Sequence, residues 1–207
     1  MKYIQLKKEL LIKDPKLDLV LNTFTPDIRK DAVSDYVRLI RIIVGQQLSG
    51  AAAKTIFSRL TDLIGNNFNE LDLLSLNQCE FAKVGISRAK AKYSQTISNF
   101  LLENPNFFEQ LKRLNSENQI TELIRFKGVG IWTASIFVMS SDIMSDVFAY
   151  GDGTLNKVIK KIYGFSDEQF NEKLEKIVIN WSPYRTLVCN ALWHYNDNVL
   201  TQTRNRI

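Results

Sequence analysis

Apolar residues recur along this chain three and four positions apart, which is the spacing of one face of an α-helix. The clearest such face is made of Val33, Tyr36, Val37, Ile40, Ile43 and Val44, and a second of Ile131, Ala134, Phe137 and Val138. Arg38 and Arg41 fall outside the first face. The sequence has no sustained apolar–polar alternation and no hairpin turn between strand-like runs. We therefore predict an all-α fold.

Four prolines supply signals for the starts of helices. Each follows a residue whose side chain can cap a helix, and proline at the first helical position lacks the amide that a helix start leaves unpaired. The four pairs are Asp14-Pro15, Thr25-Pro26, Asn104-Pro105 and Ser182-Pro183. We expect a helix to begin at each of them.

Because 45% of its residues are hydrophobic, the chain can bury a full core. Its 207 residues are too few for several independent domains. No low-complexity linker or fixed-period repeat divides it. We expect one unit, residues 1–207, made of two helical lobes. The central lobe is predicted at residues 33–147, and the second lobe at residues 1–32 with 148–207, where both chain ends meet.

Charge and cysteine content narrow the classes of function. Lys and Arg total 27 against 22 Asp and Glu, and the net charge of +5 suits a polyanionic partner. Cys79 and Cys189 have no neighbouring ligand types, which excludes an iron–sulfur cluster, and we expect two buried free thiols. Without a membrane-length apolar run or a signal peptide, we expect an intracellular protein, in the cytoplasm or nucleoid of a bacterium or the nucleus of a eukaryote.

The segment ITELIRFKGVGIWTA, residues 120–134, predicts a tight hairpin between two helices. Gly128 and Gly130 flank one apolar residue, so the turn presents bare backbone, and the helix after it begins with unpaired N–H groups. Such a turn can bind a phosphate or a small cation. Taken alone, the segment is equally compatible with a plain connection between helices.

Four segments resemble, in the right order, the helix-hairpin-helix DNA glycosylase superfamily and its 3-methyladenine glycosylase II branch. The hairpin is similar to the family's G-[VI]-G-x-x-T-A pattern, and the other three to I-x-x-Q-Q-[IL]-S-x-x-A-A, D-V-F-x-x-x-D and W-x-P-[YW]-R with a later tryptophan. The matching residues are 43–52, 123–134, 146–152, and 181–185 with Trp193. Together they extend over roughly residues 35–195.

The resemblance implies an enzyme of base excision repair that flips an alkylated purine out of double-stranded DNA and hydrolyses its N-glycosidic bond. The implied substrate is 3-methyladenine, with 7-methylguanine and hypoxanthine as further candidates. The implied fold has an active-site cleft between two helical lobes. We expect no N-terminal β-domain, because the residues before the first match have helical character, and we expect a monomer that requires no cofactor.

Asp152 matches the family's catalytic aspartate. Breaking the glycosidic bond develops positive charge on the sugar, and a nearby carboxylate stabilises that charge or orients the attacking water. Asp152 is also suited to cap a helix beginning at Gly153, and both roles can hold at once. We expect Asp146 to be structural and Arg185 to pair with a carboxylate between helices.

The aromatic residues suggest how a damaged base is held. Trp132 and Trp193 match pocket positions of the family, and Tyr150 would add a further wall. An electron-rich ring attracts a cationic base by about 0.5–2 kcal/mol. For Trp181 we prefer a place in the core. Because bifunctional members carry a lysine where this chain has Trp132, we expect a monofunctional enzyme.

By resemblance, Gln47 fills the space left by the extruded base, with Leu48 and Ser49 beside it in the minor groove. The amides of Gly128 and Gly130 and the Thr133 hydroxyl would hold a phosphate. Outside the motif, a glutamine pair on a helix is an ordinary solvated face. The backbone carbonyls that would bind Na⁺ or K⁺ are those of Ile124, Phe126 and Gly128.

Three other functions remain open from the residues. A bifunctional glycosylase for oxidised bases would need a lysine where Trp132 stands. A helix-hairpin-helix module that only binds DNA would have no use for Asp152 in its loop. A generic α-helical interaction protein would leave the order of the four motifs as coincidence.

Overall fold

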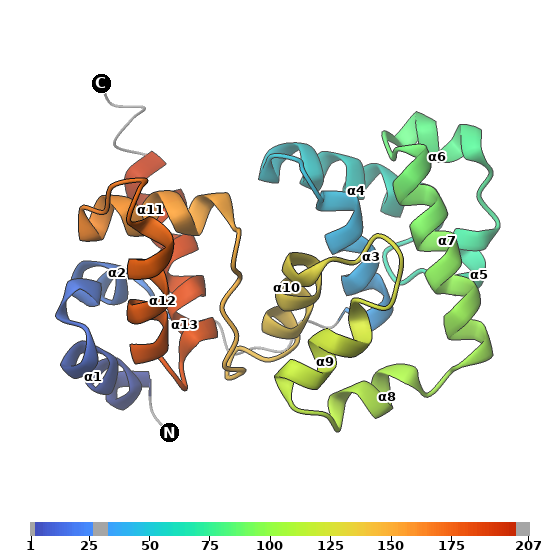
Figure 1. Cartoon of the computed structure of the whole chain (residues 1–207). Helices are drawn as coiled ribbons and strands as arrows, with labels where there is room; N and C mark the ends of the chain where they lie inside the picture. The colour runs from blue at the N-terminus through green and yellow to red at the C-terminus, as the bar shows by residue number, and fades with distance from the viewer. Residues whose placement is uncertain (1–2, 27–32, 202–207) are drawn as a thin grey trace. The chain divides into compact units, whose positions relative to one another are not determined.

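The structure, a computed structural model, describes residues 3–26 and 33–201, and within them every regular element is helical, as predicted (Figure 1). The elements are α1 Tyr3–Lys13, the 3₁₀ helix η1 Pro15–Leu17, α2 Asp18–Thr23, α3 Asp35–Gly45, α4 Gly50–Ile64, α5 Glu70–Leu74, α6 Gln78–Val84, α7 Arg88–Glu103, α8 Phe107–Lys112, α9 Ser116–Leu123, α10 Ile131–Ser141, α11 Gly153–Tyr163, α12 Phe170–Asn180, α13 Arg185–Tyr195 and the π-helical turn η2 Asn196–Leu200. None of the described helices is both long and apolar enough to cross a membrane.

The described chain forms two compact units. The terminal unit comprises residues 3–26 and 142–201, and the central unit residues 33–141. The division after residue 141 lies earlier than the predicted one after residue 147. The reason is that Asp146 and Val147 bond to Arg185 and Thr186 at the start of α13, so this segment belongs with the terminal unit.

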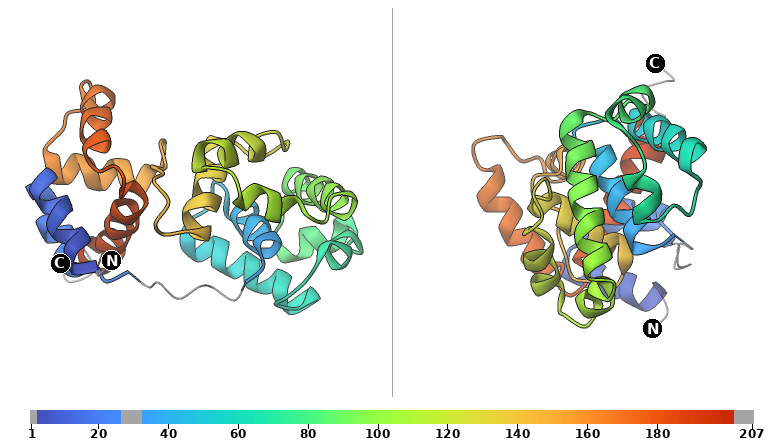
Figure 2. Two further views of the ribbon diagram at one scale, coloured as in Figure 1. Left: turned by 90° about the horizontal axis from the view of Figure 1, so that it is seen from below. Right: turned by 90° about the vertical axis from the view of Figure 1, so that its right-hand side faces the viewer.

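The central unit is built around α3, against which α4, α7 and α10 pack (Figures 1 and 2). The predicted apolar face of α3 is buried except for Val33, which is half-buried and precedes the helix, and Ala134, Phe137 and Val138 of α10 are buried too. Ile131 departs from the prediction, since 62% of it is exposed. As the first residue of α10 it follows the hairpin directly and precedes the buried part of the helix.

Of the four proline signals, Asp14-Pro15 is confirmed, since the Asp14 side chain accepts a backbone N–H at the start of η1. Two are wrong. Asn104 is instead the C-terminal cap of α7, and the Ser182 hydroxyl donates to a carboxylate while α13 begins only at Arg185. The helix predicted to start at Thr25-Pro26 would continue through residues 27–32, which lie outside the described residues.

A buried carboxylate joins the two ends of the chain within the terminal unit. Asp14 Oδ2 accepts a hydrogen bond from Trp181 Nε1 at 2.8 Å and another from the Tyr163 hydroxyl. Trp181 is fully buried, which confirms its predicted place in the core. Burial and the adjacent carboxylate raise the pKa of Tyr163, so this phenol stays a hydrogen-bond donor. The contact ties η1 to α11 and to the end of α12.

The Thr186 hydroxyl, fully buried, makes three contacts with the segment before α11. It bonds the N–H and the C=O of Val147 at 3.2 and 3.1 Å and the Ser145 hydroxyl at 2.9 Å. Thr186→Val keeps the shape but leaves the Val147 N–H unpaired, so we expect a loss of about 1–3 kcal/mol in unfolding free energy.

Urea unfolding followed by circular dichroism measures this loss. The control is Thr96→Val on α7, where the threonine is exposed and the change should stay within about 0.5 kcal/mol. Equal effects of the two substitutions would contradict the structural role of Thr186.

Candidate functional site

The predicted catalytic aspartate ends an extended segment, residues 145–152, that lies along one face of α13. Residues four apart on α13 contact this segment, and four positions is the spacing of one helix face. The contacts pair Arg185 with Asp146, Cys189 with Ala149 and Trp193 with Asp152. Because the segment is held along two turns of one rigid helix, the position of Asp152 is set by α13.

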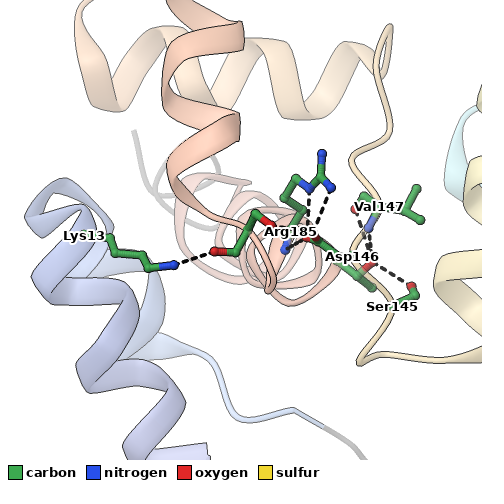
Figure 3. Close-up of polar contacts among 7 residues, drawn as sticks. Lys13, Ser145, Asp146, Val147 and Arg185 are labelled. Carbon is green, nitrogen blue, oxygen red and sulfur yellow. Dashed lines mark hydrogen bonds and ion pairs between the residues drawn. The ribbon is translucent and has the colours of Figure 1, made fainter. Parts of the chain in front are cut away.

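The first of these contacts is an ion pair with two parallel hydrogen bonds (Figure 3). Arg185 Nε and Nη2 each lie 2.8 Å from an oxygen of Asp146, and the Ser182 hydroxyl donates to the same carboxylate at 2.7 Å. Burial alone would raise the pKa of Asp146, but these hydrogen bonds outweigh it and hold that pKa below its ordinary value. The predicted structural roles of Arg185 and Asp146 are confirmed.

Asp152 is half-buried and caps α11, as predicted. Its Oδ1 accepts the Leu155 N–H at 2.9 Å and the indole N–H of Trp193 at 3.2 Å. The start of a helix favours a negative charge, because its unpaired N–H groups form the positive end of the helix dipole. The edge of Trp193 therefore faces a carboxylate whose orientation is fixed by two donors.

Tyr150 belongs to the same unit as Asp152 and Trp193. Its ring is 44% exposed and packs edge to face against Phe148, with ring centroids 4.8 Å apart. Partial burial raises the pKa of Tyr150, so its hydroxyl is neutral near pH 7. Trp132, by contrast, lies on α10 of the central unit and is half-buried there.

The two cysteines differ in exposure. Cys189 is buried, as predicted, and burial raises the pKa of its thiol to about 12. A protonated thiol is a poor nucleophile, so Cys189 is not a candidate for a catalytic nucleophile near pH 7. Cys79 is exposed on α6, which corrects the prediction that both thiols are buried.

The turn between α3 and α4, residues 46–49, contains both glutamines of the motif and places their side chains in different surroundings. Gln47 is exposed and has a φ of 57°, a left-handed conformation that costs a non-glycine residue about 1–2 kcal/mol. Leu48 is 39% exposed, and Ser49 is exposed while its hydroxyl caps α4 by accepting the Ala52 N–H. Strain in an exposed turn is typical of functional positions.

Gln46 turns the other way and bonds to the hairpin. Its Nε2 donates to the carbonyl of Gly128 at 2.8 Å and to the Thr133 hydroxyl at 2.9 Å. Thr133 is only 3% exposed, which weighs against the predicted contact of its hydroxyl with a phosphate. Sequence reasoning missed Gln46, since only its place beside Gln47 distinguished it.

Lys90 of α7 was missed as well. Its Nζ donates to the carbonyls of Val44 and Gln46, at 2.8 and 2.7 Å, where α3 ends. Burial lowers the pKa of Lys90, because the ammonium loses part of its hydration. The only sequence signal for this residue was its place in a run of basic side chains, residues 83–92.

The hairpin between α9 and α10 packs closely against α7. Gly128 has a φ of +93°, and a Cβ at this position would overlap the ring of Tyr93. The carbonyls of Phe126 and Gly128 accept hydrogen bonds from Val129 and from Gln46, so a cation bound there would share both oxygens with these donors. A cation bound by these carbonyls and that of Ile124 stays a prediction.

Gly128 and Gly130 offer a matched pair of substitutions. Gly128→Ala should lower the unfolding free energy by about 2 kcal/mol or more, from the left-handed backbone and the overlap with Tyr93. Nothing lies within 4 Å of a Cβ at Gly130, and its φ is ordinary, so Gly130→Ala should be tolerated. Urea unfolding of both variants measures the difference, and a stability of Gly128→Ala equal to that of Gly130→Ala would show that the hairpin does not pack as described.

Known proteins are similar to this chain in sequence and in fold. A DNA-3-methyladenine glycosylase from Saccharomyces cerevisiae is 29% identical over 229 residues, covering 90% of this chain and 77% of that protein. The crystal structure of a DNA-3-methyladenine glycosidase from Bacillus halodurans superposes with a TM-score of 0.76 at 25% identity, covering 95% of this chain and 91% of that one.

A Schizosaccharomyces pombe 3-methyladenine DNA glycosylase, solved in complex with abasic DNA, has the same fold, with a TM-score of 0.81, 20% identity, and coverage of 94% of this chain and 98% of that one. Residues 40–183 match the family model described as HhH-GPD superfamily base excision DNA repair protein. That match extends over most of the chain and contains the hairpin, the strained turn and Asp152. The chain belongs to the HhH-GPD superfamily of base excision DNA repair proteins.

Proposed function

We propose that this protein is a monofunctional DNA glycosylase that removes alkylated purines, 3-methyladenine first among them, from double-stranded DNA. The observation that carries the proposal is the placement of Asp152, whose carboxylate caps α11 and accepts the indole N–H of Trp193. Membership of a base excision repair family and the names of the related proteins support the same activity.

Hydrolysis of the glycosidic bond of an alkylated purine requires few catalytic groups, and one carboxylate can suffice. The bond from C1′ of the sugar to the purine nitrogen breaks, and its electron pair leaves with the base. A purine alkylated at N3 or N7 already carries a positive charge, so it departs neutral and needs no proton. Positive charge develops on the sugar, where Asp152 would stabilise it or orient the water that attacks C1′.

The aromatic residues of the terminal unit would bind the base. Trp193 is anchored by its N–H to Asp152, and Tyr150 presents a partly exposed ring with a neutral hydroxyl. A π-face attracts a cationic purine more than a neutral one, by about 0.5–2 kcal/mol, which favours alkylated bases over normal ones. 7-Methylguanine fits the same argument, whereas hypoxanthine is uncharged and should be a poorer substrate. Trp132 as a further pocket residue rests on the sequence pattern.

The central unit would provide the contacts with DNA. Gln47 extends from a strained, exposed turn with Leu48 beside it, which suits a side chain that fills the space of an extruded base. Backbone amides at Gly128 and Gly130 would bind a phosphate, which bare glycine backbone permits.

Asp152→Asn tests the catalytic role. Asparagine caps a helix as well as aspartate does, so the fold should persist, while loss of the negative charge should lower single-turnover base release by roughly 10²–10³-fold or more. Methylated duplex DNA is the substrate. Asp142→Asn, an exposed aspartate in the same unit, is the control and should retain the wild-type rate. A wild-type rate of base release by Asp152→Asn would contradict the catalytic role of Asp152.

Strand cleavage tests the monofunctional assignment. Because this chain has Trp132 where the bifunctional members carry a lysine, no amine is expected to form a Schiff base with the abasic sugar. Purified protein incubated with abasic duplex DNA and borohydride should give no covalent protein–DNA adduct and no nicked strand. Abundant adduct on a denaturing gel would show that another amine acts and that the enzyme is bifunctional.

A further inference from the structure

One face of α7 contacts both turns that the proposed function assigns to DNA. Lys90 and Tyr93 are three positions apart and therefore lie on the same side of the helix. Lys90 bonds to the end of α3 and to the 46–49 turn, and Tyr93 packs against Gly128 of the hairpin. All these residues belong to the central unit.

Lys90 is placed to control the backbone of Gln47. The Gln46 carbonyl belongs to the peptide plane that joins Gln46 to Gln47, and this plane is rigid. By bonding that carbonyl at 2.7 Å, Lys90 fixes the plane from which Gln47 departs at a φ of 57°. Its second bond, to Val44, satisfies a carbonyl that the end of α3 leaves unpaired and places a positive charge at the negative end of the helix dipole.

The Gln46 side chain extends this control to the hairpin. The side-chain Nε2 donates to the Gly128 carbonyl and the Thr133 hydroxyl, while the backbone carbonyl of Gln46 accepts from Lys90. The 46–49 turn and the hairpin are thus joined to each other by Gln46 and both to α7, one through Lys90 and the other through Tyr93. A shift of either turn would break hydrogen bonds between buried or half-buried residues, which is costly.

We propose that Lys90 is a positioning residue for base extrusion, which holds Gln47 in its strained conformation and keeps the 46–49 turn in register with the Gly128 hairpin. This inference rests on the proposed function, since it takes Gln47 to enter the base stack. Lys90 touches neither base nor sugar in this account and acts only through Gln47.

A double-mutant cycle tests the proposal. The probe is a duplex that carries an abasic-site analogue opposite 2-aminopurine, whose fluorescence rises when the stack around it is opened. The fluorescence is measured with enough of each variant to saturate the duplex. Lys90→Met should then reduce the fluorescence rise by about threefold to tenfold, as Gln47→Ala should. In the Gln47→Ala background, Lys90→Met should cause no further reduction, because its effect passes through Gln47.

Two controls separate positioning from charge and from stability. Lys92→Met removes an exposed charge from the same helix and should leave the fluorescence rise within about twofold of wild type. Each of the two variants lacks one positive charge, so the salt dependence of DNA binding should be the same for Lys92→Met and Lys90→Met. Lys90→Arg retains donors for both carbonyls and should restore most of the rise. If thermal unfolding shows that Lys90→Met is not folded, Lys90→Gln enters the same cycle.

The proposal is overturned by additive losses in the cycle, by a Lys90→Met rise equal to that of Lys92→Met, or by a wild-type protein that binds the duplex with no rise at all. A rise without base release from methylated DNA would contradict the proposed function and leave the positioning role intact. The two claims therefore fail separately.

Discussion

The placement of Asp152 depends on one face of α13. Arg185, Cys189 and Trp193 each hold a point on the segment that leads to the aspartate, and Asp146 contributes the strongest of these contacts through paired hydrogen bonds. Near its end the segment has a turn, in which the Tyr150 N–H donates to the Phe148 carbonyl and the Asp152 N–H to the Ala149 carbonyl, while its earlier part lacks regular structure. The contacts with α13 hold the rest of the segment, so the position of Asp152 depends on this helix as well as on the turn before it.

The central unit uses the same principle with other chemistry. Neither the 46–49 turn nor the hairpin has regular structure, and both are held by side chains of a neighbouring helix or turn. Lys90 and Gln46 contribute hydrogen bonds, and Tyr93 contributes a flat surface that only glycine can approach. The exposed Gln47 is thereby kept in a conformation it would otherwise avoid.

Sequence pattern predicted the helices, the hairpin and the cap at Asp152, because these depend on local spacing and on neighbours a few residues away. It predicted that Arg185 pairs with a carboxylate, but it missed other contacts that join distant segments. The Ser182 hydroxyl bonds to Asp146 instead of capping a helix, and the Thr133 hydroxyl accepts a hydrogen bond from Gln46. Lys90 could not be distinguished from its basic neighbours, because its carbonyl partners lie more than forty residues away.

Chromatography of the bases released from N-methylated duplex DNA tests the central claim most directly. Purified protein in excess over DNA should release 3-methyladenine first, while normal purines stay attached and the strands remain intact. Methylated DNA that keeps all of its modified purines, although the folded protein binds it, would contradict a glycosylase activity.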